Sequence, residues 1–274
     1  MVSNNMTDII TVIFREELPV LKLQAKSIEL YCQDLEVGNI IVVVNDNELD
    51  LSELDRNWWG KFSDQVVFVH RRTWNIDYAE NGWLTQQLLK MLATGIGKSE
   101  WSIVLDAKTI FVRPVKRLAQ RPVVGKQSIV SVFSVSQQRV GDLFKVDLSY
   151  QLGPAGIPFI FNNQLVQEMF IDVEKLTGCS FGRWFQDQGM ITEFILYSGY
   201  VLYKFGSYDS IYDTSNLPAI TPCNLCHSEV ASFDRKFTEM AGTDTVSIHR
   251  RAWSQLTDEQ QSKYTNFLKS RGIE

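Results

Sequence analysis

The sequence of 274 residues is 45% hydrophobic and 22% charged, which supplies enough apolar material for the core of one large domain. With 27 basic and 32 acidic residues, its formal net charge is −5. This balance argues against a general nucleic-acid-binding protein, because such proteins are usually basic.

Short apolar runs that end in polar residues recur in the first part of the chain. They predict strands at Ile9–Phe14, Ile40–Val44, Val66–Val69 and Ile103–Leu105. Continuous apolar runs are typical of strands buried on both faces of a largely parallel sheet. Ligands bind at the carboxyl edge of such a sheet, so we expect a binding site where these runs end.

Two helices are predicted between these strands from apolar residues at helical spacing. The first runs from Pro19 to Tyr31. The second covers Gly82–Leu92, where Gln86 and Lys90 lie four residues apart on one polar face. On spacing alone, this polar face is interpreted as solvent-exposed.

The stretch Trp101–Val115 contains a polar crossing between two apolar pieces. Asp106 follows the predicted strand directly, and the apolar pattern resumes at Ile110–Val112. Asp106 is interpreted either as a turn residue that accepts backbone N–H groups or as a ligand-binding group at the sheet edge.

The second half of the chain predicts strands at Ile129–Phe133 and Ile157–Phe161, and then a helix capped by Asn162 and its neighbour. A short strand is predicted at Val246–Ile248. The last helix is predicted to begin at a capping box, Thr257–Gln260.

Polar side chains interrupt the aromatic and aliphatic segment Arg183–Phe205. They are Asp187, Gln188 and Glu193. A carboxylate beside aromatic rings is partly desolvated, which raises its pKa and suits it to accept a proton. The alternative is that Thr192 and Glu193 only begin a helix favourably.

The order of these segments resembles glycosyltransferases with the GT-A fold. In that family, a strand ending in an Asp-x-Asp motif delivers acidic residues to a divalent cation that holds the diphosphate of a nucleotide-sugar. Here this DXD-like motif is Asp106-Ala107-Lys108, with lysine in place of the second acid. The Gly-Trp-x-x-Gln-Gln-Leu-x-Lys segment that begins at Gly82 is similar to that of a group of uncharacterised glycosyltransferase-like bacterial and phage proteins.

The resemblance implies a single α/β domain over residues 1–274, with a mostly parallel central sheet flanked by helices. Residues 1–115 would form the nucleotide-binding half, and residues 116–274 the acceptor half with the C-terminal helix. The implied activity is that of a hexosyltransferase, which moves a sugar from a nucleotide-sugar, foremost a UDP-sugar, to a hydroxyl group of a glycan or other acceptor. The alternatives are a catalytically inactive nucleotide-sugar-binding protein and a glycoside hydrolase, which needs two opposed carboxylates and no nucleotide.

The resemblance also implies roles for individual residues. Those expected at the donor and its diphosphate are Arg15, Gln86, Lys90, Asp106, Ala107, Lys108, His249 and Arg250. Those expected in catalysis are Glu193, Asp187 and Gln188. Glu193 is the first choice of base for an inverting reaction, and Asp187 is the alternative.

A divalent cation, Mn²⁺ or Mg²⁺, is expected at Asp106 and His249 on the same resemblance. Such a hard cation needs several oxygen ligands, and the ammonium group of Lys108 offers none. Lys108 is therefore an alternative source of positive charge for the diphosphate. Both interpretations stay open.

The sequence Cys223–His227 spells C-x-x-C-H, which matches the haem attachment motif. Haem attachment needs export, and a zinc site needs a second pair of ligands at suitable spacing. We therefore expect no haem and a turn with two buried thiols.

Location is expected from what the sequence lacks. No apolar run approaches the length of a membrane span, and the first residues show neither the charged nor the apolar region of a signal peptide. The 4 cysteines are too few and too unevenly placed for a disulfide framework. We expect a cytoplasmic protein with no membrane span and no nucleic-acid partner; the sequence does not indicate an oligomeric state.

Overall fold

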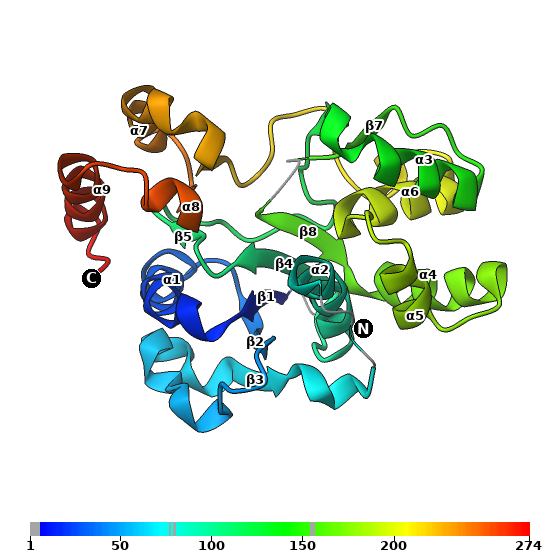
Figure 1. Ribbon diagram of the computed structural model, residues 1–274, viewed down its shortest axis with the longest axis horizontal. Helices are drawn as coiled ribbons and strands as arrows, with labels where there is room; N and C mark the ends of the chain where they lie inside the picture. Colours follow the sequence, from blue (N-terminus) through cyan, green and yellow to red (C-terminus); the bar gives the residue numbers. More distant parts are fainter. Residues whose placement is uncertain (1–5, 77, 79–80, 154–156) are drawn as a thin grey trace.

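A computed structural model describes residues 6–76, 78, 81–153 and 157–274. Its centre is a five-stranded sheet in the order β3-β2-β1-β4-β8 (Figure 1). The strands are β1 (Thr7–Ile13), β2 (Val37–Val44), β3 (Val66–His70), β4 (Trp101–Asp106) and β8 (Phe159–Asn162). The first four are parallel, and β8 runs antiparallel to β4. The predicted mostly parallel central sheet is confirmed.

The middle strand β1 is buried along its whole length. Ile10 pairs with Ile41 of β2 on one side and with Val104 of β4 on the other, and none of the three is exposed. Burying an aliphatic side chain of this size contributes on the order of 1.5–3 kcal/mol. The continuous apolar runs are therefore stable as strands because helices cover both faces of the sheet.

These helices lie with α1 on one face of the sheet and α2 on the other (Figure 1). Their bounds are α1 (Leu18–Tyr31), α2 (Gly82–Leu92), α3 (Ser134–Phe144), α4 (Asn163–Thr177), α5 (Phe181–Asp187) and α6 (Glu193–Phe205). The polar face of α2 is less exposed than its spacing suggested, and only Gln86 of the two residues on it is partly exposed. Because α2 packs against β1, α5 and α6, Lys90 is only 2% exposed.

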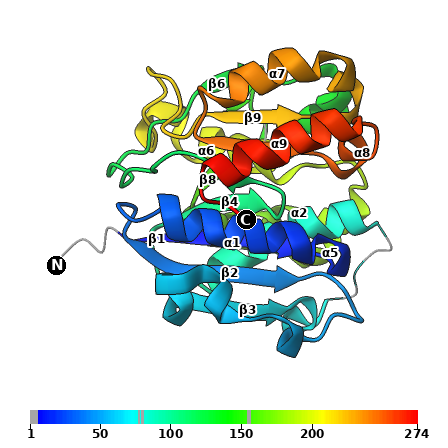
Figure 2. The same ribbon diagram turned by 90° about the vertical axis from the view of Figure 1, so that its left-hand side faces the viewer.

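A smaller sheet in the order β5-β10-β9 lies above the main sheet in Figure 2. Its strands are β5 (Ile110–Phe111), β9 (Pro222–Leu225) and β10 (Thr245–Ile248), and the helices beside it are α7 (Phe233–Met240), α8 (Arg250–Trp253) and α9 (Asp258–Ser270). Together they enclose a second apolar core. Antiparallel pairing of Val246 with Ile110, continued along the strands, brings the end of β10 opposite Lys108.

Two local predictions are wrong. The segment Ile129–Phe133 is not a strand: its last three residues form a 3-10 turn that leads into α3, and Val132 is 65% exposed, so an apolar run here has no sheet to cover. The predicted turn at Cys223 is strand β9. Cys223 is buried, but Cys226 beyond the strand is exposed, and all four thiols are free.

The last helix begins as predicted. Thr257 and Gln260 form a reciprocal capping box, in which each side chain accepts a hydrogen bond from the backbone N–H of the other. Within the part of the chain that the structure describes, no helix combines the length and apolar character needed to cross a bilayer.

Candidate active site

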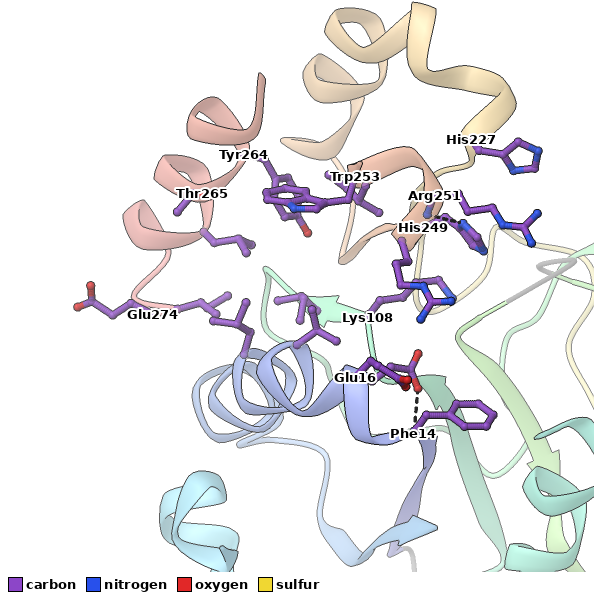
Figure 3. Close-up of a pocket in the computed structure, with 18 of the residues that line it drawn as sticks. Phe14, Glu16, Lys108, His227, His249, Arg251, Trp253, Tyr264, Thr265 and Glu274 are labelled. Carbon is purple, nitrogen blue, oxygen red and sulfur yellow. Dashed lines mark hydrogen bonds between the residues drawn. The ribbon is translucent and has the colours of Figure 1, made fainter. Parts of the chain in front are cut away.

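A cleft of about 870 Å³ lies between the start of α1, the β4–β5 turn and the C-terminal segment (Figure 3). Figure 3 shows Lys108, His249 and Arg251 gathered at one end, and Trp253 and Tyr264 at the other. The polar end is lined by Glu16, Glu17, Gln86, Lys108, His227, His249, Arg250 and Arg251. The apolar end is lined mainly by Val20, Leu23, Trp253, Tyr264, Leu268 and Ile273. The cleft therefore lies at the carboxyl edge of β1 and β4, where the sequence predicts a ligand site.

Two lysines hold Asp106 at the end of β4. The Nζ atom of Lys90 lies 2.9 Å from Oδ1, and the Nζ atom of Lys108 donates a hydrogen bond of 2.6 Å to Oδ2. The Lys90 contact is an ion pair without hydrogen-bond geometry. Burial alone would raise the pKa of Asp106, but the two ammonium groups outweigh it and hold this pKa well below its usual range.

Glu193 contacts Lys90 from the first turn of α6. It is completely buried and accepts a hydrogen bond of 3.2 Å from Lys90. Turned with its amide nitrogen toward the carboxylate, Gln87 donates to both oxygens of Glu193 and accepts from the Trp83 indole at 3.1 Å. Burial raises the pKa of Glu193, and Lys90 opposes the rise. This placement lets Glu193 position Lys90, but it leaves no surface of Glu193 that an acceptor could touch.

His249 directly follows β10 and caps α8. Its Nδ1 atom accepts the backbone N–H of Arg251 at 3.1 Å. Burial and the nearby positive charges, of which Lys108 is the largest, lower the pKa of His249. The ring is therefore neutral near pH 7, and with Nδ1 used as an acceptor its proton is assigned to Nε2.

The donor set around Asp106 does not fit a hard divalent cation. Among the described residues, no three His, Cys, Asp or Glu side chains are grouped so that they could hold a metal ion. Both oxygens of Asp106 face ammonium groups, and a cation of this kind prefers six or more oxygen ligands. Nδ1 of His249 already accepts a backbone N–H.

The other residues expected at the site are more scattered. Gln86 lines the cleft, whereas Ala107 is completely buried. Arg15 is exposed and binds both carboxylate oxygens of Glu53, at 3.0 and 2.7 Å, and it does not line the cleft.

Asp187 and Gln188 are not brought to this cleft. Asp187 borders a separate cavity of about 770 Å³ beside α5 and pairs with Arg183 at 3.7 Å. The Gln188 side chain donates to the carbonyl oxygen of Trp184 at 3.1 Å. The structure thus gathers Lys90, Asp106, Lys108 and Glu193 into one cluster and leaves these two residues outside it.

Sequence reasoning overlooked Glu17, a carboxylate that lines the cleft. It accepts the backbone N–H of Phe14 at 3.1 Å. Burial raises the pKa of Glu17, and the Phe14 N–H and the charge of Lys108 act against the rise. The signal was present, because Arg15-Glu16-Glu17 directly follows the first predicted strand, at the edge where ligands bind.

Comparison with known proteins gives a family and a fold. A model for a family of unknown function (DUF6492) matches residues 9–245, and no curated protein matches the sequence. The apo structure of the bifunctional glycosyltransferase WbbM has a TM-score of 0.51 at 10% identity, over 90% of this chain and 46% of that one. This chain thus spans about half the length of WbbM.

A structure of an active-site mutant of LgtC has a TM-score of 0.50 at 12% identity, over 96% of this chain and 95% of that one. Together with the sheet order and the flanking helices, these neighbours confirm the predicted GT-A fold.

Proposed function

The chain belongs to the DUF6492 family, and we propose that it transfers a sugar from a nucleoside diphosphate donor to a hydroxyl acceptor. The observation that carries the proposal is the group of basic residues at the polar end of the cleft. Lys108, His249 and Arg250 meet there at the carboxyl edge of the parallel sheet, where α/β folds bind nucleotides. The glycosyltransferase fold of WbbM supports the same class of reaction.

The proposed chemistry follows from where charge develops. In glycosyl transfer, the sugar gains oxocarbenium character, and the leaving diphosphate gains negative charge. Fixed positive groups at the diphosphate stabilise that charge. Arg250 and Arg251 can supply it, because neither forms an ion pair with a carboxylate among the described residues.

An inverting reaction needs a carboxylate that substrate can reach. Glu193 is completely buried and Asp187 lies at another cavity, whereas Glu17 faces the cleft. Its raised pKa suits proton transfer near neutral pH better than an ordinary exposed carboxylate does. We therefore assign the base of an inverting reaction to Glu17 in place of Glu193.

The proposed donor is a UDP-sugar, and the proposed acceptor is a hydroxyl group of a glycan. The chain would divide into a donor half, residues 1–115, and an acceptor half, residues 116–274. Both halves contribute to the cleft, since Lys108 comes from the first and His249 from the second.

The test is a panel of nucleotide-sugars incubated with the purified protein, with thermal shift and released nucleoside diphosphate as readouts. We expect a selective shift, slow release alone and faster release with an acceptor. Arg250→Ala should weaken the shift, and Arg235→Ala, an exposed arginine on α7 paired with Glu239, should not. A shift without any release would indicate a nucleotide-sugar-binding protein, and no shift with any donor would refute the proposal.

A further inference from the structure

We propose that Lys108 takes the place of a divalent cation, so that the donor diphosphate binds to Lys108, His249 and Arg250 without any metal ion. This inference rests on the proposed glycosyltransferase function and specifies how its donor is held. It depends on three features of the cleft: the two lysines bound to the carboxylate of Asp106, the orientation of His249, and the arginines nearby that form no ion pair with a described carboxylate.

Each carboxylate oxygen of Asp106 already contacts an ammonium group. Lys90 and Lys108 approach its two oxygens at 2.9 and 2.6 Å. A divalent cation bound to either oxygen would lie beside an ammonium group, and like charges at such distances repel strongly in a partly buried site. Lys90 cannot withdraw to solvent, because its side chain is 3% exposed and is also bound to Glu193.

His249 presents a hydrogen-bond donor to the cleft. Its Nδ1 atom accepts the Arg251 N–H at 3.1 Å, so the neutral ring carries its proton on Nε2. A metal ligand would need its lone pair there and its proton on Nδ1, facing another N–H. An N–H at Nε2 is instead suited to a phosphate oxygen.

Lys108 can bind an anion because its ion pair with Asp106 fixes its position while part of its side chain stays exposed to the cleft. Its side chain is 26% exposed and lines the cleft beside His249 and Arg250. Within the cluster, two lysines balance Asp106 and Glu193. Arg250 and Arg251 line the same end of the cleft as Glu16 and Glu17, but neither arginine forms an ion pair with a described carboxylate. A diphosphate can therefore bind to these arginines and to Lys108 without first breaking an ion pair of either arginine.

The decisive measurement is calorimetric titration of the whole chain with UDP, first in EDTA and then with Mn²⁺. We expect the two dissociation constants to agree within about twofold, because the positive charge is supplied by side chains. UDP binding that appears only with Mn²⁺ would overturn this inference and leave the transferase proposal standing. Absence of UDP binding in both conditions would overturn this inference and the choice of UDP as the donor nucleotide, whereas the transferase proposal fails only if no donor of the panel binds.

Variants at position 108 separate a charge role from a structural one. In EDTA, Lys108→Met should weaken UDP binding about tenfold or more, and Lys108→Arg should retain most of it. Lys98→Met, at an exposed lysine away from the cleft, is the matched control. Unchanged binding in Lys108→Met that is folded by circular dichroism would contradict the assignment.

The substitution Lys108→Asp restores the second acid of an Asp-x-Asp pair. It should abolish UDP binding in EDTA and recover part of it with Mn²⁺, and electron paramagnetic resonance should show Mn²⁺ bound to this variant more tightly than to the wild type. Equal Mn²⁺ binding by the two proteins would mean that Lys108 does not exclude the metal, against the inference.

Discussion

The substitution Lys90→Met tests whether the buried charge cluster holds the fold together. Met keeps most of the aliphatic volume of lysine, so little cavity forms. It removes the one ammonium that contacts both Asp106 and Glu193, at 2.9 and 3.2 Å. Removing one partner of a buried ion pair costs about 3–5 kcal/mol. We expect about 3 kcal/mol, the lower end of that range, because Asp106 keeps Lys108 and Glu193 keeps Gln87.

The assay is urea unfolding followed by circular dichroism, with Glu193→Gln and the double variant completing a cycle. The coupling between Lys90 and Glu193 should be about 1–3 kcal/mol, as for residues in direct contact. Lys98→Met, at an exposed position, should change the free energy of unfolding by no more than about 0.5 kcal/mol. A cost below about 1 kcal/mol for Lys90→Met, or a coupling near zero, would refute the claim that this network is a stabilising one.

Three further predictions concern single positions. The pKa of Asp106 in the folded protein lies below its ordinary value of 3.8. The ionised carboxylate therefore stabilises the fold above that pH, and this stabilisation is lost as the pH falls through the folded pKa. The difference in free energy of unfolding between wild type and Asp106→Asn, measured by urea unfolding, should shrink below about pH 4. Glu17→Gln should lower turnover about a hundredfold while UDP affinity changes little, and an equal loss of both would contradict a base. Gly199→Ala places a Cβ against Val140 of α3 and should cost about 1–3 kcal/mol; an unchanged melting temperature would show that α3 yields freely.

The strands of the main sheet could be predicted because a strand buried on both faces has a continuous apolar run in its own sequence. A strand such as β2, with Ile40 to Val44 all buried, shows a continuous apolar run that needs no knowledge of its neighbours. The segment before α3 could not be predicted in this way. Residues 129–133 have a strand-like composition, but Val130 and Val132 are more than half exposed, and no window of sequence contains that information.

The apolar runs alone predicted the part of the candidate site that follows the strand ends. Asp106, Lys108 and His249 directly follow apolar runs, and the structure places them together. The burial of Lys90 comes from the packing of α2 against β1, α5 and α6, and its bond to Glu193 joins residues 103 positions apart. Spacing along a helix reports which residues share a face, but it does not report what that face packs against.

The two-residue strand β5 has a consequence for the timing of activity during synthesis. It is the only described segment of the first 115 residues that pairs with the small sheet, and its partner β10 is made more than a hundred residues later. A nascent chain can complete its main sheet while the wall that carries His249 is still within the ribosome. Anion binding by the cleft would therefore begin only after β10 and His249 have been made and have docked, later than completion of the main sheet.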